Sequence, residues 1–175
     1  MNAGAQRPVI HLDDLEFFEI GQLKPGAPDG YHGARLAPIS SRIGARKLGY
    51  NLTEVPPGKA AFPRHNHYAI EEMFFILAGE GELRLGDDCY PVRAGDVVAC
   101  PTGDASTAHQ LRNTSADQPL RYLAVSTADA VDLVQYPDSG KTGAAHVSGR
   151  DAQGLPIAVR IMNRSDANLD YWDGE

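Results

Sequence analysis

Short apolar runs separated by glycine and proline dominate the middle of the chain. The clearest runs cover residues 47–55, 72–77, 82–85, 89–92, 96–100 and 120–126. Turn residues stand between them, as at 56–58 (PPG) and 78–81 (AGEG). Short strands at this spacing, each bounded by turn residues, are typical of a β-sandwich or β-barrel. No segment keeps a helical period for three turns, although residues 13–20 fit either a strand or a short helix.

The two flanks of this β-rich middle are less regular. Residues 1–44 hold one apolar segment at 15–20, and residues 128–175 hold apolar residues that are mostly isolated between small and polar ones. We therefore predict one domain over 1–175, with a barrel core at about 45–127 and irregular flanks at 1–44 and 128–175 that wrap the barrel. Within the second flank we expect residues 139–154 to be irregular or mobile. Tyr171 and Trp172 are expected to dock on the barrel.

Composition and charge exclude several classes of protein. The chain has 175 residues and a formal net charge of −7, so it is sized for one ordinary domain and repels nucleic-acid phosphates. No apolar run approaches the roughly 20 residues of a membrane-spanning helix. The first residues lack the basic and apolar regions of a signal peptide, and two cysteines are too few for a disulfide framework. We expect a cytoplasmic protein without nucleic-acid or membrane partners.

The candidate chemistry lies around one pair of histidines. His65 and His67 stand two residues apart, so in an extended strand both imidazoles point to the same face. Glu72 joins that face only if residues 68–70 form a loop that starts a new strand, and His109 is a fourth candidate after a later turn. Three ring nitrogens and one carboxylate suit a divalent transition metal with positions left for water or substrate. Iron, manganese, zinc and nickel all remain open.

Two stretches of the chain resemble the conserved motifs of the cupin superfamily. The first reads Gly58 … His65-x-His67 … Glu72-x6-Gly79, and the second reads Gly95-x5-Pro101-x-Gly103 … His109-x3-Asn113. The spacing to Gly79 favours Glu72 over its neighbour Glu71 as the motif glutamate. Two loops are longer than usual for the family: the loop before His65 has one extra residue, and five residues instead of two precede His109.

The resemblance covers about residues 45–127, and the wider sequence is similar to single-domain bacterial cupins that mostly lack an assigned activity. It implies a double-stranded β-helix, or jelly-roll, barrel with a metal in one mouth. The implied ligands are His65, His67, Glu72 and His109. Cupins commonly dimerise, and the strand expected at 72–77 is apolar on both faces. We therefore expect a homodimer with the N-terminal segment 15–20 at or near the interface.

Three classes of function remain open at this point. The first is a metal-dependent enzyme that acts on a small polar organic molecule, of sugar or carboxylate type, by dioxygenation, isomerisation, decarboxylation or hydrolysis. The second is a non-catalytic module that binds such a ligand in the same pocket, and the third is an assembly protein with this fold. Tyr68, Glu71 and Arg64 are the nearest candidates for a general acid or base. None of them identifies a reaction, so the catalytic residues and the substrate stay unknown.

Overall fold

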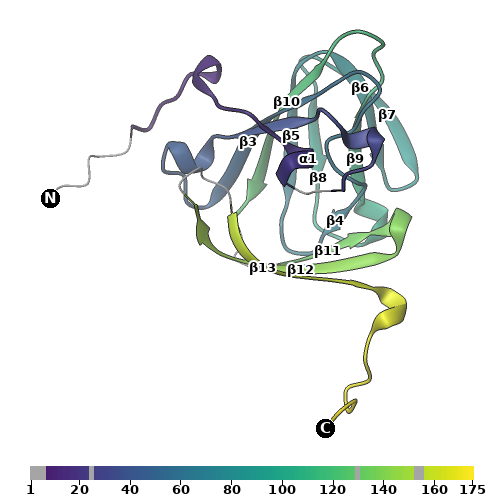
Figure 1. Ribbon diagram of the computed structural model, residues 1–175. Helices are drawn as coiled ribbons and strands as arrows, with labels where there is room; N and C mark the ends of the chain where they lie inside the picture. The colour runs from purple at the N-terminus through teal and green to yellow at the C-terminus, as the bar shows by residue number, and fades with distance from the viewer. Residues whose placement is uncertain (1–6, 24–25, 129–130, 152–155) are drawn as a thin grey trace, which may run out of the picture.

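The computed structural model describes residues 7–23, 26–128, 131–151 and 156–175, which are mostly β-strands (Figure 1). The strands are β1 (Phe18–Glu19), β2 (Arg35–Pro38), β3 (Leu48–Val55), β4 (Asn66–His67), β5 (Glu72–Ala78), β6 (Glu80–Leu85), β7 (Asp88–Arg93), β8 (Val97–Cys100), β9 (His109–Asn113), β10 (Leu120–Thr127), β11 (Val131–Tyr136), β12 (Lys141–Arg150) and β13 (Pro156–Arg164). The helix is α1 (Ile20–Leu23), and the 3₁₀ turns are η1 (Leu12–Asp14), η2 (Asp29–Tyr31), η3 (Ser40–Arg42), η4 (Ala105–Thr107), η5 (Pro137–Ser139) and η6 (Ser165–Ala167). No helix among these residues has the length and apolar character needed to cross a membrane.

The described strands form three antiparallel sheets. One sheet has the order β1-β2-β3-β10-β5-β8, a second has the order β7-β6-β9, and a third has the order β13-β12-β11-β4. The first two sheets build a barrel, and the third closes one end of it (Figure 1). Each apolar run expected to be a strand corresponds to one of these elements, and the predicted jelly-roll fold is confirmed.

Two apolar clusters hold the barrel together. The larger one fills the barrel interior with fully buried side chains from neighbouring strands, such as Ile76 of β5 and Leu120 of β10. The smaller one lies on the other face of the six-stranded sheet, where Leu15 and Leu52 are buried together. The two apolar faces of β5 are thus explained, because Ile76 points into the barrel and Leu77 packs on the smaller cluster.

The turn between β5 and β6 explains why a glycine stands at position 79. Gly79 has a φ of +81°, a conformation that side chains with a Cβ rarely adopt. A Cβ at this position would lie 3.0 Å from the Cα of Leu120 and closer still to the carbonyl oxygen of Pro119. The turn therefore packs directly on the backbone that leads into β10, and only glycine allows this approach.

The C-terminal flank differs from its prediction. Residues 141–150 form strand β12, which pairs with β11 and β13, so the expectation of an irregular segment at 139–154 is wrong for this part. Small residues make the pairing possible: Gly143 lies under Met162 of β13, where a Cβ would meet the Met162 side chain. Residues 152–154 of that segment lie outside the described residues.

The expected docking of the C-terminal aromatic pair is also wrong. Tyr171 is 83% exposed and Trp172 is 72% exposed. The chain after β13 runs away from the barrel (Figure 1). The two rings contact each other edge to face, with their centroids 4.8 Å apart.

Candidate metal centre

Four side chains that are far apart in sequence meet at one mouth of the barrel. His65 directly precedes β4, His67 lies on β4, and Glu72 and His109 are the first residues of β5 and β9. One ligand atom from each of these residues lies within 4.8 Å of all the others. Two ligand atoms that each lie about 2.1 Å from one ion span roughly 4.2 Å at most. A shift of a few tenths of an ångström would thus let all four side chains reach one ion.

Backbone pairing explains why His109 reaches the cluster despite the long loop before it. His65 and His109 form a β-bridge, with N–H···O distances of 3.1 and 2.8 Å in the two directions. The extra residues of that loop form the 3₁₀ turn η4, which Asp104 caps by accepting a hydrogen bond from the Ser106 N–H at 2.9 Å. The extra residues are therefore accommodated in η4, before His109 pairs with His65.

The loop that the sequence required between His67 and Glu72 is present. The Tyr68 N–H donates to the Leu133 carbonyl at 3.0 Å, and the Thr127 N–H donates to the Glu71 carbonyl at 3.0 Å. These bonds hold residues 68–71 between β11 and β10 and let β5 begin at Glu72.

Each histidine ring is oriented by an acceptor opposite its Nδ1 atom. His65 Nδ1 lies 2.8 Å from the Pro63 carbonyl, and His67 Nδ1 lies 2.5 Å from Asp132 Oδ2. His109 Nδ1 lies 3.3 Å from the Thr107 carbonyl. This pattern places the proton on Nδ1 and leaves the lone pair of Nε2 for a metal, as is usual for metal-bound histidines.

The Nε2 atoms have few partners other than Glu72. His109 Nε2 lies 3.0 Å and His67 Nε2 lies 3.5 Å from Glu72 Oε2. Among the described residues, the buried Nε2 of His67 has no hydrogen-bond partner. A buried nitrogen of this kind costs free energy unless a further group binds it. The donor set and this unpaired atom both fit a metal ion.

The electrostatics of the cluster favour a neutral His65 and an ionised Glu72, the states in which these two groups bind a metal. Burial, and then the neighbouring His109, lower the pKa of His65 to about 4, so this ring is neutral at pH 7. Burial opposes ionisation of Glu72, but the adjacent rings of His109 and His67 hold its pKa well below the usual range. Burial likewise opposes protonation of His67, but Glu72 and Asp132 outweigh it and raise the pKa of this ring.

Asp132 belongs to the site and was not found from the sequence. It lies on β11 with 5% of its surface exposed, contacts His67 Nδ1 and accepts a hydrogen bond from the Ala69 N–H at 3.0 Å. The available signal was a single acidic residue within the apolar run VDLV. Acidic side chains are rarely buried unless they have a partner.

The three residues considered as general acids or bases do not line the cavity at the cluster. Tyr68 is 43% exposed and donates to Gln135 at 3.0 Å, while Glu71 is exposed. Arg64 is buried and bonded to Asp138 and to backbone carbonyls. Their side chains therefore lie away from the space beside the histidines.

A cavity of about 250 Å³ opens beside the cluster, and we call it the inner cavity. Its wall is mostly aromatic and apolar, with Asn51 as a neutral polar residue; the lining residues are Asn51, Phe62, Pro63, His65, His67, Glu72, Phe74, Tyr122, Ala124, Val134 and Tyr136. Tyr136 stacks on His65, with the ring centroids 5.9 Å apart. Burial raises the pKa of both Tyr122 and Tyr136, so their hydroxyls stay protonated at pH 7 and can donate hydrogen bonds.

An antiparallel jelly-roll barrel with three histidines and one glutamate at its mouth is the architecture of a cupin. The family model described as a cupin domain (Cupin_2) matches residues 51–126. The chain therefore contains a cupin domain, and the resemblance noted in the sequence is confirmed.

Comparison with individual proteins supports the fold over a greater length. A sugar phosphate isomerase from the cupin superfamily of Silicibacter pomeroyi superposes with a TM-score of 0.72 at 24% identity, covering 95% of this chain and 98% of that one. At this identity the likeness concerns the fold.

Two curated proteins are similar in sequence over a shorter region. An uncharacterized protein of Methanocaldococcus jannaschii is 34% identical over 62 residues, which are 35% of this chain and 46% of that protein. The oxalate-binding protein of Thermotoga maritima is 33% identical over 72 residues, which are 41% of this chain and 55% of that protein. The match thus spans about half the length of each relative.

Proposed function

We propose that this protein binds one divalent transition metal through His65, His67, Glu72 and His109, and that the metal binds a small polar organic molecule of sugar or carboxylate type. The observation that carries the proposal is the buried, unpaired Nε2 of His67 beside three other potential ligand atoms. Four protein ligands leave one or two positions of a five- or six-coordinate ion for oxygen atoms of the ligand. When bound, the metal would act as a Lewis acid that orients and polarises those oxygens.

The alternative is a non-catalytic binding module, and one observation favours it. Apart from the four metal-ligand candidates, the titratable residues that line the inner cavity are Tyr122 and Tyr136, both with raised pKa values. The described residues thus place no separate carboxylate or histidine in this cavity as a general base. A reaction here would depend on the metal, with the two phenols as hydrogen-bond donors.

The relatives support a small polar ligand in general terms. One similar protein is described as oxalate-binding and one structural neighbour as a sugar phosphate isomerase. Both descriptions name small molecules rich in oxygen. The oxygen atoms of such molecules suit the coordination positions that the four protein ligands would leave open on the metal.

Metal analysis of two matched variants tests the site. His67→Ala removes a ligand and should lower the metal content of untagged protein at least tenfold, while the barrel stays folded. Glu71→Ala, in which the neighbouring exposed carboxylate is removed, should keep the metal content of the wild type. Equal loss in both variants, or full occupancy in the His67 variant, would contradict the proposal.

We also propose that the protein is a homodimer, with an outer apolar patch on the third sheet as its interface. Val131, Leu133, Val159 and Ile161 form this patch and are 60%, 40%, 67% and 58% exposed. His146 of β12 pairs with both Val131 and Val159, and Ala144 pairs with both Leu133 and Ile161, so the four side chains share one face. Asp132 and its alternate neighbours point the other way, into the barrel mouth.

The segment 15–20 offers less apolar surface to a second copy, because Leu15 and Ile20 are buried within their own chain. Light scattering should report about twice 18.8 kDa. A monomeric mass at micromolar concentration would contradict the proposal.

A further inference from the structure

A second cavity of about 440 Å³ adjoins the inner one, and we call it the outer cavity. Phe62, Pro63 and Tyr136 line both cavities. Pockets for small molecules commonly measure about 300–1,000 Å³. The inner cavity of about 250 Å³ falls below this range, whereas the outer one lies within it. A ligand that fills the site would therefore extend from the metal past Tyr136.

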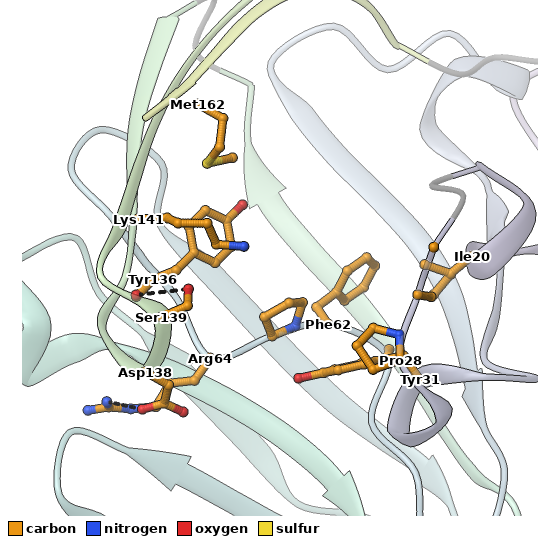
Figure 2. Close-up of a pocket in the computed structure, with 14 residues that line it drawn as sticks. Ile20, Pro28, Tyr31, Phe62, Arg64, Tyr136, Asp138, Ser139, Lys141 and Met162 are labelled. Carbon is orange, nitrogen blue, oxygen red and sulfur yellow. Dashed lines mark hydrogen bonds and ion pairs between the residues drawn. The ribbon is translucent and has the colours of Figure 1, made fainter. Parts of the chain in front are cut away.

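Two segments from opposite ends of the chain form the walls of the outer cavity. Figure 2 shows Tyr136, Lys141 and Met162 on one side, contributed by β11, β12 and β13. The N-terminal segment contributes Ile20, Pro28 and Tyr31 to the opposite side. Both segments lie outside the region 51–126 matched by the cupin domain, so the flanks add these two walls to a floor that includes Phe62 and Pro63 of the domain.

Lys141 is the available cation of this cavity. It forms no ion pair with any residue that the structure describes, and its Nζ lies 5.3 Å from the centroid of the Tyr136 ring. An ammonium beside an aromatic ring and an apolar wall is well placed to bind an anionic group on an otherwise apolar ligand.

The one carboxylate that lines the outer cavity in the described part of the chain, Asp138, is already paired with two arginines. Arg64 and Arg84 both bind the carboxylate of Asp138, at 3.1 and 2.7 Å. Arg64 is 6% exposed and also donates to the Gly86 carbonyl at 2.7 Å. Its Nε–H is buried without a partner among the described residues. Asp138 therefore does not repel an anionic ligand.

We propose that the outer cavity binds the body of an elongated organic acid and that Lys141 binds its terminal anionic group. The polar head group of the acid would lie at the proposed metal ligands, a ring-sized apolar part would lie against Phe62 and Tyr136, and a carboxylate or similar anion would contact Lys141. This inference rests on the proposed metal function for the position of the head group. The apolar lining of the outer cavity, with Ile20, Pro28 and Met162, argues for an apolar body rather than a fully hydroxylated one.

A series of three α-hydroxy acids tests each part of the ligand separately. Lactate provides the chelating head alone, 3-phenyllactate adds the ring, and 3-(4-carboxyphenyl)lactate adds the terminal carboxylate. With zinc-loaded wild-type protein, isothermal titration should show affinity rising at least tenfold at each step. Equal affinities for lactate and the carboxylated compound would overturn the proposal.

Two variants with a matched control assign these gains to residues. Lys141→Met should reduce the affinity for the carboxylated compound about tenfold, to that of 3-phenyllactate, and leave 3-phenyllactate unchanged. Lys47→Met, the control, removes an exposed lysine outside the cavity and should change none of the three. Ala27→Phe fills the outer cavity and should weaken both aromatic compounds while sparing lactate. An equal effect of Lys141→Met on all three ligands would overturn the proposal.

Two further measurements separate this inference from the metal site and from another class of ligand. In metal-free protein, 3-(4-carboxyphenyl)propionate lacks the chelating hydroxyl and reports on the outer cavity alone. Its binding to the wild type, weakened by Lys141→Met, supports the outer cavity even if no metal binds. Failure of that binding while zinc still binds overturns the inference and leaves the metal site intact. Binding of fructose 6-phosphate without any of the aromatic compounds would show that the ligand class is wrong.

Discussion

The contact between Asp132 and His67 gives the sharpest quantitative prediction for the site. Replacing Asp132 by Asn keeps the size of the side chain and an oxygen that can accept the Ala69 N–H, but it removes the negative charge opposite His67 Nδ1. The two atoms lie 2.5 Å apart, and Asp132 is 5% exposed, so solvent screens this charge only weakly. We expect Asp132→Asn to weaken metal binding.

The expected loss follows from the strength of a charge-assisted hydrogen bond. Such bonds contribute about 1.5–3 kcal/mol, and changes to groups that orient a metal-bound histidine lower metal affinity about 10- to 100-fold. The amide introduced by Asp132→Asn could also donate its N–H to His67 Nδ1 and stabilise the wrong tautomer, with the proton on Nε2, which acts in the same direction. A loss of about 10- to 100-fold in metal affinity is therefore expected.

Competition with a chromogenic chelator measures this affinity directly. Asp88→Asn is a matched control, because Asp88 is exposed on β7 and does not line the inner cavity. Thermal unfolding of the metal-free variants separates a loss of metal affinity from a loss of folding. If Asp132→Asn bound metal within twofold of the wild type while His67→Ala lost it, the reasoning from ring orientation would be wrong.

Three further predictions concern stability and assembly. Since folding lowers the pKa of His65 from 6.5 to about 4, the unfolded chain takes up this proton first as the pH falls. Metal-free protein should therefore lose at most about 3 kcal/mol of unfolding free energy between pH 6.5 and 4 from this group. Denaturant titrations of His65→Gln should show a smaller loss over the same pH range. Gly79→Ala should destabilise the fold by at least about 2 kcal/mol more than Gly58→Ala in thermal and denaturant unfolding, because both glycines have positive φ but only a Cβ at Gly79 meets backbone; equal losses would contradict the close packing of the turn. Val159→Asp introduces a charge into the outer apolar patch and should shift the light-scattering mass from dimer to monomer, and an unchanged dimer would exclude this patch as the interface.

The sequence by itself was sufficient for the fold class and for the set of candidate ligands. Alternating and doubly apolar strands, bounded by glycine and proline, report local backbone preferences that tertiary packing did not override. The two-residue spacing of His65 and His67 encodes a shared face of one strand, and the position of Gly79 selects Glu72. The strand pattern and the histidine spacing are local signals. The position of Gly79 belongs to a motif whose residue spacing is set by the turns and strands of the barrel.

Tertiary structure alone decided which distant segments complete the site. Asp132 lies 65 residues after His67 and reaches it because β11 pairs with β4, a pairing that no local pattern specifies. Lys141 likewise faces the N-terminal segment only because the C-terminal strands fold back over the barrel mouth. The tail was expected to be irregular because its apolar residues are sparse, yet its strands are held by pairing with one another. Strand pairing of this kind depends on partners far away in sequence, and for that reason the flanks, unlike the motifs, had to be read from the three-dimensional structure.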